Sequence, residues 1–310
     1  MFDEAEYDGC SDLNPDQKVA HYQSVLTPKS EDLDFLRSLP SPRPFGHFLN
    51  QTKRYLQLHP LSLVGEVGLD RSFRIPEAWL PEQAESRDDA LTPGGREGRK
   101  LSPYRVSMEH QKKVLIAQLH LAGEMSRSVS VHGVQAHGIV YETIASTWKG
   151  HEVRTPSKKE RKRKDAQAST ITVSLNQSSD GPTAAPKPYP PRICLHSFSG
   201  PAETVKQYIA PSVPCDIFFS FSTTINAWSD SSDGKVEAAV KAVPSDRLLV
   251  ESDLHTAGEK MDHYLEEVVR RICLVKQWTL QEGVTQLAQN WRRFVFGSQA
   301  HVQLAETPDE

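Results

Sequence analysis

Four residues of metal-ligand type stand at the ends of short apolar runs that are far apart in the 310-residue chain. Glu66 follows LSLVG, His132 ends SVSVH, His196 ends RICLH, and Asp253 follows LLVES. If these runs are strands of a parallel α/β barrel, their carboxyl ends meet at one rim and the four side chains converge. Two imidazoles and two carboxylates suit Zn²⁺ or Mn²⁺ and, less comfortably, Mg²⁺.

Such a set can hold metal ions that activate water and stabilise charge on a phosphoryl oxygen. Each residue taken alone has a simpler interpretation, because a single His or Glu at a strand end is more often a polar residue that faces a loop. Four independent strand ends with ligand-type residues favour a metal site. Spacing alone leaves both interpretations open.

The elements that must position these residues alternate between strands and helices. Five runs rich in Val, Ile, Leu or Phe predict strands that are buried on both faces of a parallel sheet. They are Leu61–Glu66, Ser128–His132, Arg192–His196, Asp216–Phe221 and Arg247–Glu251. Apolar stripes and end signals predict helices over Phe45–Leu56, Met108–Ala122, Gly200–Ile209, Asp233–Val243, Met261–Val275 and Thr279–Phe294. Strands separated by helices predict βαβ crossovers and an α/β fold.

Composition excludes several classes of protein. The 36 basic and 40 acidic residues give a net charge of −4, which argues against a general nucleic-acid coat. No apolar run approaches the roughly 18–20 residues that span a bilayer, and no signal peptide is visible. Four scattered cysteines form neither a disulfide scaffold nor a CxxC zinc site. We expect a soluble protein of the cytoplasm or nucleus that does not act at a membrane.

Two inserts interrupt the predicted domain over residues 45–297. Pro76–Pro103 and Lys149–Pro191 are rich in proline and charge and short of apolar residues, which predicts disorder. Ile171–Leu175, within the second insert, is either disordered or an edge strand. The basic run Lys158–Lys164 is either a localisation or nucleic-acid-contacting segment or a solvated patch. Residues 1–44 are expected to be an irregular N-terminal tail, and residues 298–310 a C-terminal tail.

The sequence segments around the four candidate ligands resemble those of a known family. VGEVGLDRSF resembles the GEIGLD segment of the TatD-type metal-dependent deoxyribonucleases, and SVSVHGVQA is similar to their strand ending in HSREA. ICLHSFSG resembles their HCFSG, VESD their ETD, and LAQNWRRFVFG their C-terminal N-x-x-x-x-F signature. The matches occur in the family's order from about residue 45 to residue 297.

This resemblance implies an amidohydrolase-like TIM barrel with one or two divalent ions (Mg²⁺, Mn²⁺ or Zn²⁺) at a phosphodiesterase site. It implies that Glu66 is shared by both ions and that His132 and His196 hold the second ion. Asp253 then belongs to the first ion and orients or deprotonates the attacking water. Glu66 and Asp253 are thus the expected catalytic residues, DNA is the expected substrate, and Asp70 is expected to support the site from behind.

The chain also departs from the family pattern. It contains no His-x-His pair, which the family places on its first strand as two ligands of the first ion. Only five of eight barrel strands are visible, so we expect an incomplete barrel that lacks the first strands, as in an N-terminally shortened family member. Val134 stands where HSREA has an arginine that could clamp a phosphate. His255 follows VESD in place of a proline and is either an added ligand or a loop residue.

The sequence leaves two candidate functions open. The first is a TatD-type hydrolase of phosphodiester bonds whose activity is impaired by the loss of the His-x-His strand. The second is a non-catalytic interaction protein that keeps the family fold, since some fungal relatives with long inserts are partners of a cell-division complex. Metal binding discriminates between the two.

Overall fold

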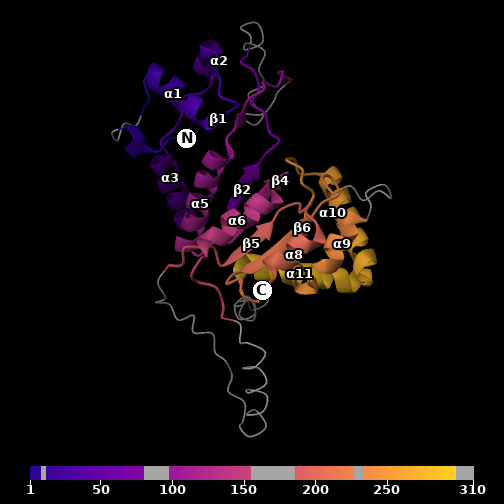
Figure 1. Ribbon diagram of the computed structural model, residues 1–310. Coiled ribbons are helices and arrows are strands. Elements are labelled where there is room, and N and C mark those ends of the chain that lie inside the picture. The colour runs from indigo at the N-terminus through magenta and orange to yellow at the C-terminus, as the bar shows by residue number, and fades with distance from the viewer. Residues whose placement is uncertain (8–11, 80–97, 155–185, 227–233, 298–310) are drawn as a thin grey trace, which may run out of the picture.

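A five-stranded parallel sheet forms the centre of the computed structural model, which describes residues 1–7, 12–79, 98–154, 186–226 and 234–297 (Figure 1). The strands lie in the order β2-β4-β5-β6-β7. Their bounds are β2 Val64–Asp70, β4 Val129–Val134, β5 Arg192–Leu195, β6 Asp216–Phe221 and β7 Leu248–Val250. Each overlaps one of the five expected runs, although β2 begins three residues later and continues four residues past Glu66, so the predicted α/β fold with a parallel sheet is confirmed. Within the described residues β2 and β7 are edges, and the sheet does not close into a barrel.

Helices connect these strands and continue beyond them (Figure 1). They are α3 Phe45–Leu58, α5 Met108–Glu124, α6 His137–Thr147, α8 Ala202–Tyr208, α9 Lys235–Ala242, the 3₁₀ turn η2 Ser245–Arg247, α10 Glu259–Lys276 and α11 Leu280–Phe296. The predicted capping box at the start of α11 is present, with Thr279 and Glu282 bonding each other's backbone N–H. None of the helices in the described ranges has both the length and the apolar character needed to cross a membrane.

The two faces of the sheet are buried in different ways, because alternate residues of a strand point to opposite faces. One face packs against the helices and forms the main core, to which β6 contributes Ile217, Phe219 and Phe221. The other face forms a smaller cluster of Cys194, Phe218 and Leu249 with the side chain of Phe294 from α11.

The end of α11 is tied to the start of the sheet by polar contacts. Asn290 donates to the backbone carbonyls of Ser245 and Leu248 at 2.8 Å each. The Nε of Arg192, the first residue of β5, donates to the Phe294 carbonyl at 2.7 Å. A cation there satisfies carbonyls that the last turn of a helix leaves without partners. The residues of the C-terminal signature therefore close the amino-terminal end of the sheet.

Gln111 of α5 completes the exposed edge of β2. Its Oε1 accepts from the Asp70 backbone N–H at 2.8 Å, and its Nε2 donates to the carbonyls of Asp70 and Val106 at 2.9 Å each. The next backbone N–H, from Arg71, points the other way and bonds Val134 of β4. One side-chain amide thus takes the place that a neighbouring strand would occupy beside Asp70.

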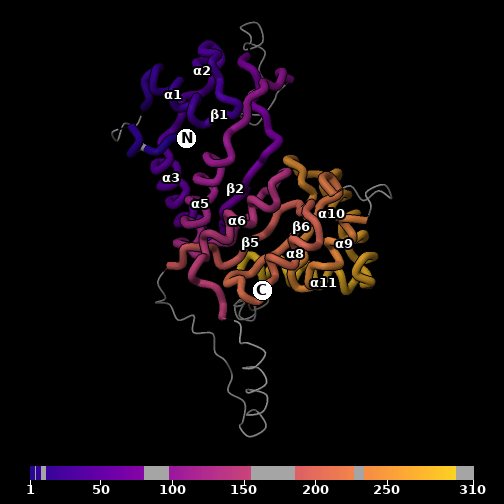
Figure 2. Tube along the Cα trace, viewed as in Figure 1, coloured from indigo at the N-terminus to yellow at the C-terminus, as the bar shows by residue number. Residues whose placement is uncertain are grey.

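Residues 1–44 are not an irregular tail, which corrects the expectation for this segment. They contain η1 (Glu4–Tyr7), α1 (Pro15–Val25), β1 (Leu26–Thr27) and α2 (Leu33–Ser38), and β1 pairs antiparallel with β3 (Arg105–Val106). A separate small core of Leu26, Phe35, Leu36 and Leu39 holds them together beside α3 and α5 (Figure 2). The helices were missed because they are short and carry few apolar residues, although Asn14 and Gln17 form a capping box.

The two predicted inserts are only partly described. The stem of the first pairs with itself, since Pro76 and Leu101 form an antiparallel bridge and Ser102 N–H donates to the Ile75 carbonyl. The remainder of the predicted disorder, over residues 80–97 and 155–185, lies outside the described residues. So do the basic run Lys158–Lys164, the segment Ile171–Leu175 and the C-terminal tail 298–310. The proposed domain boundaries stay predictions.

Replacing Gln111 with leucine is expected to lower the free energy of unfolding by about 2–3 kcal/mol. The substitution removes three hydrogen bonds, each with a net value of about 0.5–1.5 kcal/mol, and leaves part-buried backbone groups without partners. Urea denaturation measures the change. Gln281→Leu on the exposed side of α11 is the matched control, and equal losses in the two variants would contradict the role of Gln111.

The stability of the chain is expected to fall as the solution becomes acidic because of His21. This side chain is 3% exposed among aromatic rings, and burial lowers its pKa to about 4. Between pH 6.5 and 4 the unfolded chain binds a proton that the native chain excludes. The free energy of unfolding should therefore drop by up to about 1.4 kcal/mol per pH unit in that window. Denaturation of wild type and His21→Phe across pH 4–7 tests this, and parallel curves would refute it.

Candidate metal centre

Glu66 lies within β2 rather than at its end, at a point where the strand is irregular. The pairing of β2 with β4 shifts register between Val64 and Val67, and such bulges turn a side chain toward a new direction. The two strands then approach closely at Gly68, where an added Cβ would lie 2.1 Å from the carbonyl oxygen of His132. The absence of a side chain at Gly68 therefore allows Glu66 and His132 to meet across the pair.

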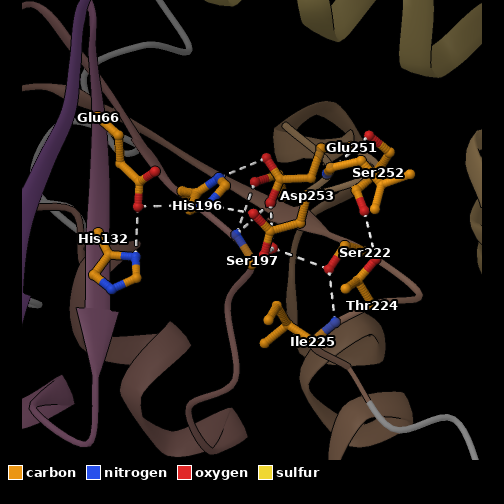
Figure 3. A network of polar contacts seen from close by, with 12 residues as sticks. Glu66, His132, His196, Ser197, Ser222, Thr224, Ile225, Glu251, Ser252 and Asp253 are labelled. Atoms are coloured by element: carbon orange, nitrogen blue, oxygen red, sulfur yellow. Dashed lines mark hydrogen bonds and ion pairs between the residues drawn. The ribbon is translucent and has the colours of Figure 1, made fainter. Parts of the chain in front are cut away.

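Three of the four predicted ligands come together from β2, β4 and the end of β5. One oxygen of Glu66 lies 2.5 Å from Nδ1 of His132 and 3.6 Å from Nε2 of His196. One donor atom from each of the three residues lies within 4.8 Å of the others. Figure 3 shows the carboxylate of Glu66 directed at both imidazoles. Side chains separated by up to 130 positions thus share one site.

Asp253 joins the same site through His196, since its Oδ1 lies 3.2 Å from Nε2 of that imidazole. Asp70 lies behind the site, with Oδ2 4.0 Å from Nε2 of His132 and Oδ1 accepting from Ser72 and Phe73. His255 is exposed in the loop before α10. The structure thus brings Glu66, His132 and His196 together, with Asp253 and Asp70 beside them, and their roles as ligands stay predictions.

Glu251, directly after β7, is the residue that the sequence-based prediction did not include. Its Oε2 lies 2.8 Å from Nδ1 of His196, and its Oε1 accepts from the N–H and hydroxyl of Ser197 at 2.5 and 2.6 Å. The signal that could have found it was present, because Glu251 is a carboxylate at a strand end just as Asp253 is.

The charges of these groups shift their pKa values in opposite directions. The hydrogen bond from His132 lowers the pKa of Glu66, and the same bond raises the pKa of His132. Burial by itself lowers the pKa of His196, but the hydrogen bond to Glu251 and the nearby carboxylates outweigh it and raise this pKa to about 9. Protons on the imidazoles therefore offset part of the negative charge of the site.

The three clustered residues are of types that could hold a divalent cation. Two ligands of one Zn²⁺ with bonds of about 2.0–2.2 Å lie at most about 4.2 Å apart, and the Glu66 oxygen meets this limit with both imidazoles. Imidazole nitrogen and carboxylate oxygen suit Zn²⁺ and Mn²⁺. The carboxylates of Asp70, Glu251 and Asp253 around the cluster add the negative charge that favours a cation.

Comparison with known proteins finds a matching family and several similar proteins. A model of the TatD related DNase family matches residues 42–296. The Cut9-interacting protein scn1 of Schizosaccharomyces pombe is 36% identical over 279 residues, which cover 90% of this chain and 75% of that protein. The uncharacterized deoxyribonuclease YMR262W of Saccharomyces cerevisiae is 26% identical over 292 residues, 93% of this chain and 73% of that one. YjjV, a TatD homolog from Escherichia coli K12, aligns at 16% identity with a TM-score of 0.45 over 80% of this chain and 69% of its own.

The fold is a parallel α/β sheet, and imidazoles and carboxylates cluster near the carboxyl ends of its strands. These two features define a class of α/β proteins with a site that could hold a metal ion. The chain belongs to the TatD related DNase family, because the family match spans all five strands of the sheet and the four predicted ligands. The resemblance noted in the sequence is thereby confirmed.

Metal affinity is expected to increase with pH, because an imidazole must lose its proton before it can bind a cation. His196 has a pKa of about 9 and that of His132 is also raised, so protons compete with the metal at neutral pH. The apparent dissociation constant for Mn²⁺ should fall by up to about tenfold per pH unit for each displaced proton, and level off above pH 9. Calorimetric titration in buffers of different protonation enthalpy counts these protons; a constant affinity from pH 6 to 9 would disprove the competition.

Proposed function

We propose that this protein is a metal-dependent hydrolase that cleaves phosphodiester bonds, with DNA as its substrate. The observation that carries this proposal is the convergence of Glu66, His132 and His196, with donor atoms within 4.8 Å of one another. Membership of the TatD related DNase family and a yeast relative named as a deoxyribonuclease support the substrate class.

In this proposal Glu66, His132 and His196 hold one divalent ion, and Asp253 completes the site. When bound, the ion supplies a Lewis acid that polarises a phosphoryl oxygen and lowers the pKa of water. Asp253 acts as the general base, because its Oδ1 faces the cluster while its Oδ2 lies 3.1 Å from the hydroxyl of Ser197. Asp70 keeps the His132 ring in place from the far side.

One ion rather than two is proposed because the chain lacks the His-x-His pair. A second ion would have only Glu66 and Asp253 among the predicted ligands. Val134 also offers no charge to clamp a phosphate where the family has arginine. We therefore expect hydrolysis that is slower than a two-metal site allows and that depends strictly on added metal.

Hydrolysis of DNA ends by the chain with Mn²⁺ or Mg²⁺ should drop to background in the double variant His132→Ala/His196→Ala. The variant removes two of the three clustered donors, so neither the cation nor its charge remains at the reacting phosphate. Release of nucleotides from a labelled duplex measures the activity, and a chelator should abolish it in the wild type.

His263→Ala is the matched control, because this histidine is exposed on α10 and is not one of the clustered donors. It should retain wild-type activity. Undiminished cleavage by the double variant would refute the assignment of the site.

An interaction protein that keeps the family fold is the second candidate function. The relative that is 36% identical over 90% of this chain is named for its interaction with Cut9. On this alternative the chain binds a protein partner, and the clustered residues Glu66, His132 and His196 serve the fold alone.

Calorimetric titration with Mn²⁺ and Zn²⁺ separates the two candidates at low cost. Binding at micromolar metal that is lost in His132→Ala/His196→Ala supports the hydrolase. No heat of binding at that concentration favours the interaction protein.

A further inference from the structure

Glu251 is surrounded by hydrogen-bond donors, most of which come from the two residues that follow β5, with Ser220 of β6 adding another. Its side chain is 22% exposed, and its two oxygens receive the Nδ1 of His196 and both the N–H and the hydroxyl of Ser197. Three hydrogen-bond donors at 2.5–2.8 Å occupy the carboxylate. Its negative charge is thus directed at protein groups, whereas that of Glu66 is directed into the cluster.

The contact with His196 decides which nitrogen of the ring faces the site. A carboxylate accepts and cannot donate, so Nδ1 must carry a proton when it meets Glu251. In the neutral ring this leaves the lone pair on Nε2, which lies 3.6 Å from Glu66 and 3.2 Å from Asp253. Carboxylates that hold the second nitrogen of a metal-binding histidine fix its tautomer and its orientation in this way.

Through its contact with Ser197, Glu251 also influences the position of the Asp253 carboxylate. The Ser197 hydroxyl lies 2.6 Å from Glu251 Oε1 and 3.1 Å from Asp253 Oδ2, so one proton stands between two carboxylates. Both Ser197 and Asp253 have left-handed backbones, with φ of 40° and 55°. Residues other than glycine hold such angles only when surrounding contacts impose them. The N–H bond from Ser197 to Glu251 is one such contact.

We propose that Glu251 is a positioning residue that presents Nε2 of His196 and, through Ser197, the carboxylate of Asp253 to a divalent cation that it does not itself contact. The proposal deepens the function proposed above and rests on it for its catalytic consequence. The part of the proposal that concerns the His196 tautomer applies to the chain without metal and can be tested without an activity assay.

The first test needs neither metal nor DNA. Nitrogen-15 NMR of the histidine side chains, at a pH above 9 where His196 is neutral, should find its proton on Nδ1 in the wild type. In Glu251→Gln the preference should shift toward Nε2–H, because an amide can offer either a donor or an acceptor to the ring. Glu142→Gln, at an exposed position of α6, is the control and should leave the spectrum unchanged. An Nε2–H tautomer in the wild type overturns the proposal.

The second test measures affinity for Mn²⁺ by calorimetry. Glu251→Gln should weaken binding by about 10–100-fold, as is usual when a group behind a metal ligand is changed, and Glu251→Asp should recover part of the loss. Ser197→Ala should keep the Nδ1–H tautomer while weakening binding, and it serves if the glutamine variant fails to fold. Affinity within twofold of wild type in both Glu251→Gln and Ser197→Ala overturns the proposal. A correct tautomer in a chain that does not cleave DNA would remove the proposed function and leave this inference intact.

Discussion

The parallel pairing of β2 with β4 is the constraint on which the site depends. Glu66 comes from one strand and His132 from the other, and they meet only because Gly68 lets the two backbones approach without an intervening side chain. Among the strands that the structure describes, β2 is also an edge of the sheet, and β4 is the one strand that hydrogen-bonds to it. The amide of Gln111 supplies part of what the other side lacks, which connects the order of an edge strand to the geometry of a charged cluster.

Charge balance is the second feature that unites the site. The carboxylates of Glu66, Asp70, Glu251 and Asp253 surround two imidazoles, and the raised pKa of each imidazole follows from them. A group of this kind is stable at neutral pH with either protons or a cation in its centre. A cation in the cluster would replace the contact between Glu66 and His132, whereas the contact between Glu251 and Nδ1 of His196 would remain.

Much of the fold and the site could be predicted from the sequence, and what could not has a physical reason. Strands buried on both faces read as apolar runs, so all five were found, and parallel topology then brought Glu66, His132, His196 and Asp253 together. The helices of residues 1–44 were missed because their order comes from a small local core around Leu36 rather than from a long apolar stripe. Glu251 could have been found as a carboxylate at a strand end, but its hydrogen bonds to His196 and Ser197 depend on the packing of two strands and cannot be read from spacing.

β5 is a short strand with a different task at each end. Arg192 at its start donates hydrogen bonds to carbonyls in the last turn of α11, and His196, which follows its last residue, lies in the candidate metal site. Packed interiors transmit strain, so we expect a disturbance at Arg192 to shift the His196 imidazole at the other end of this short strand. Lesions in the C-terminal helix would therefore resemble ligand mutations in a genetic screen, although they lie on the opposite side of the sheet.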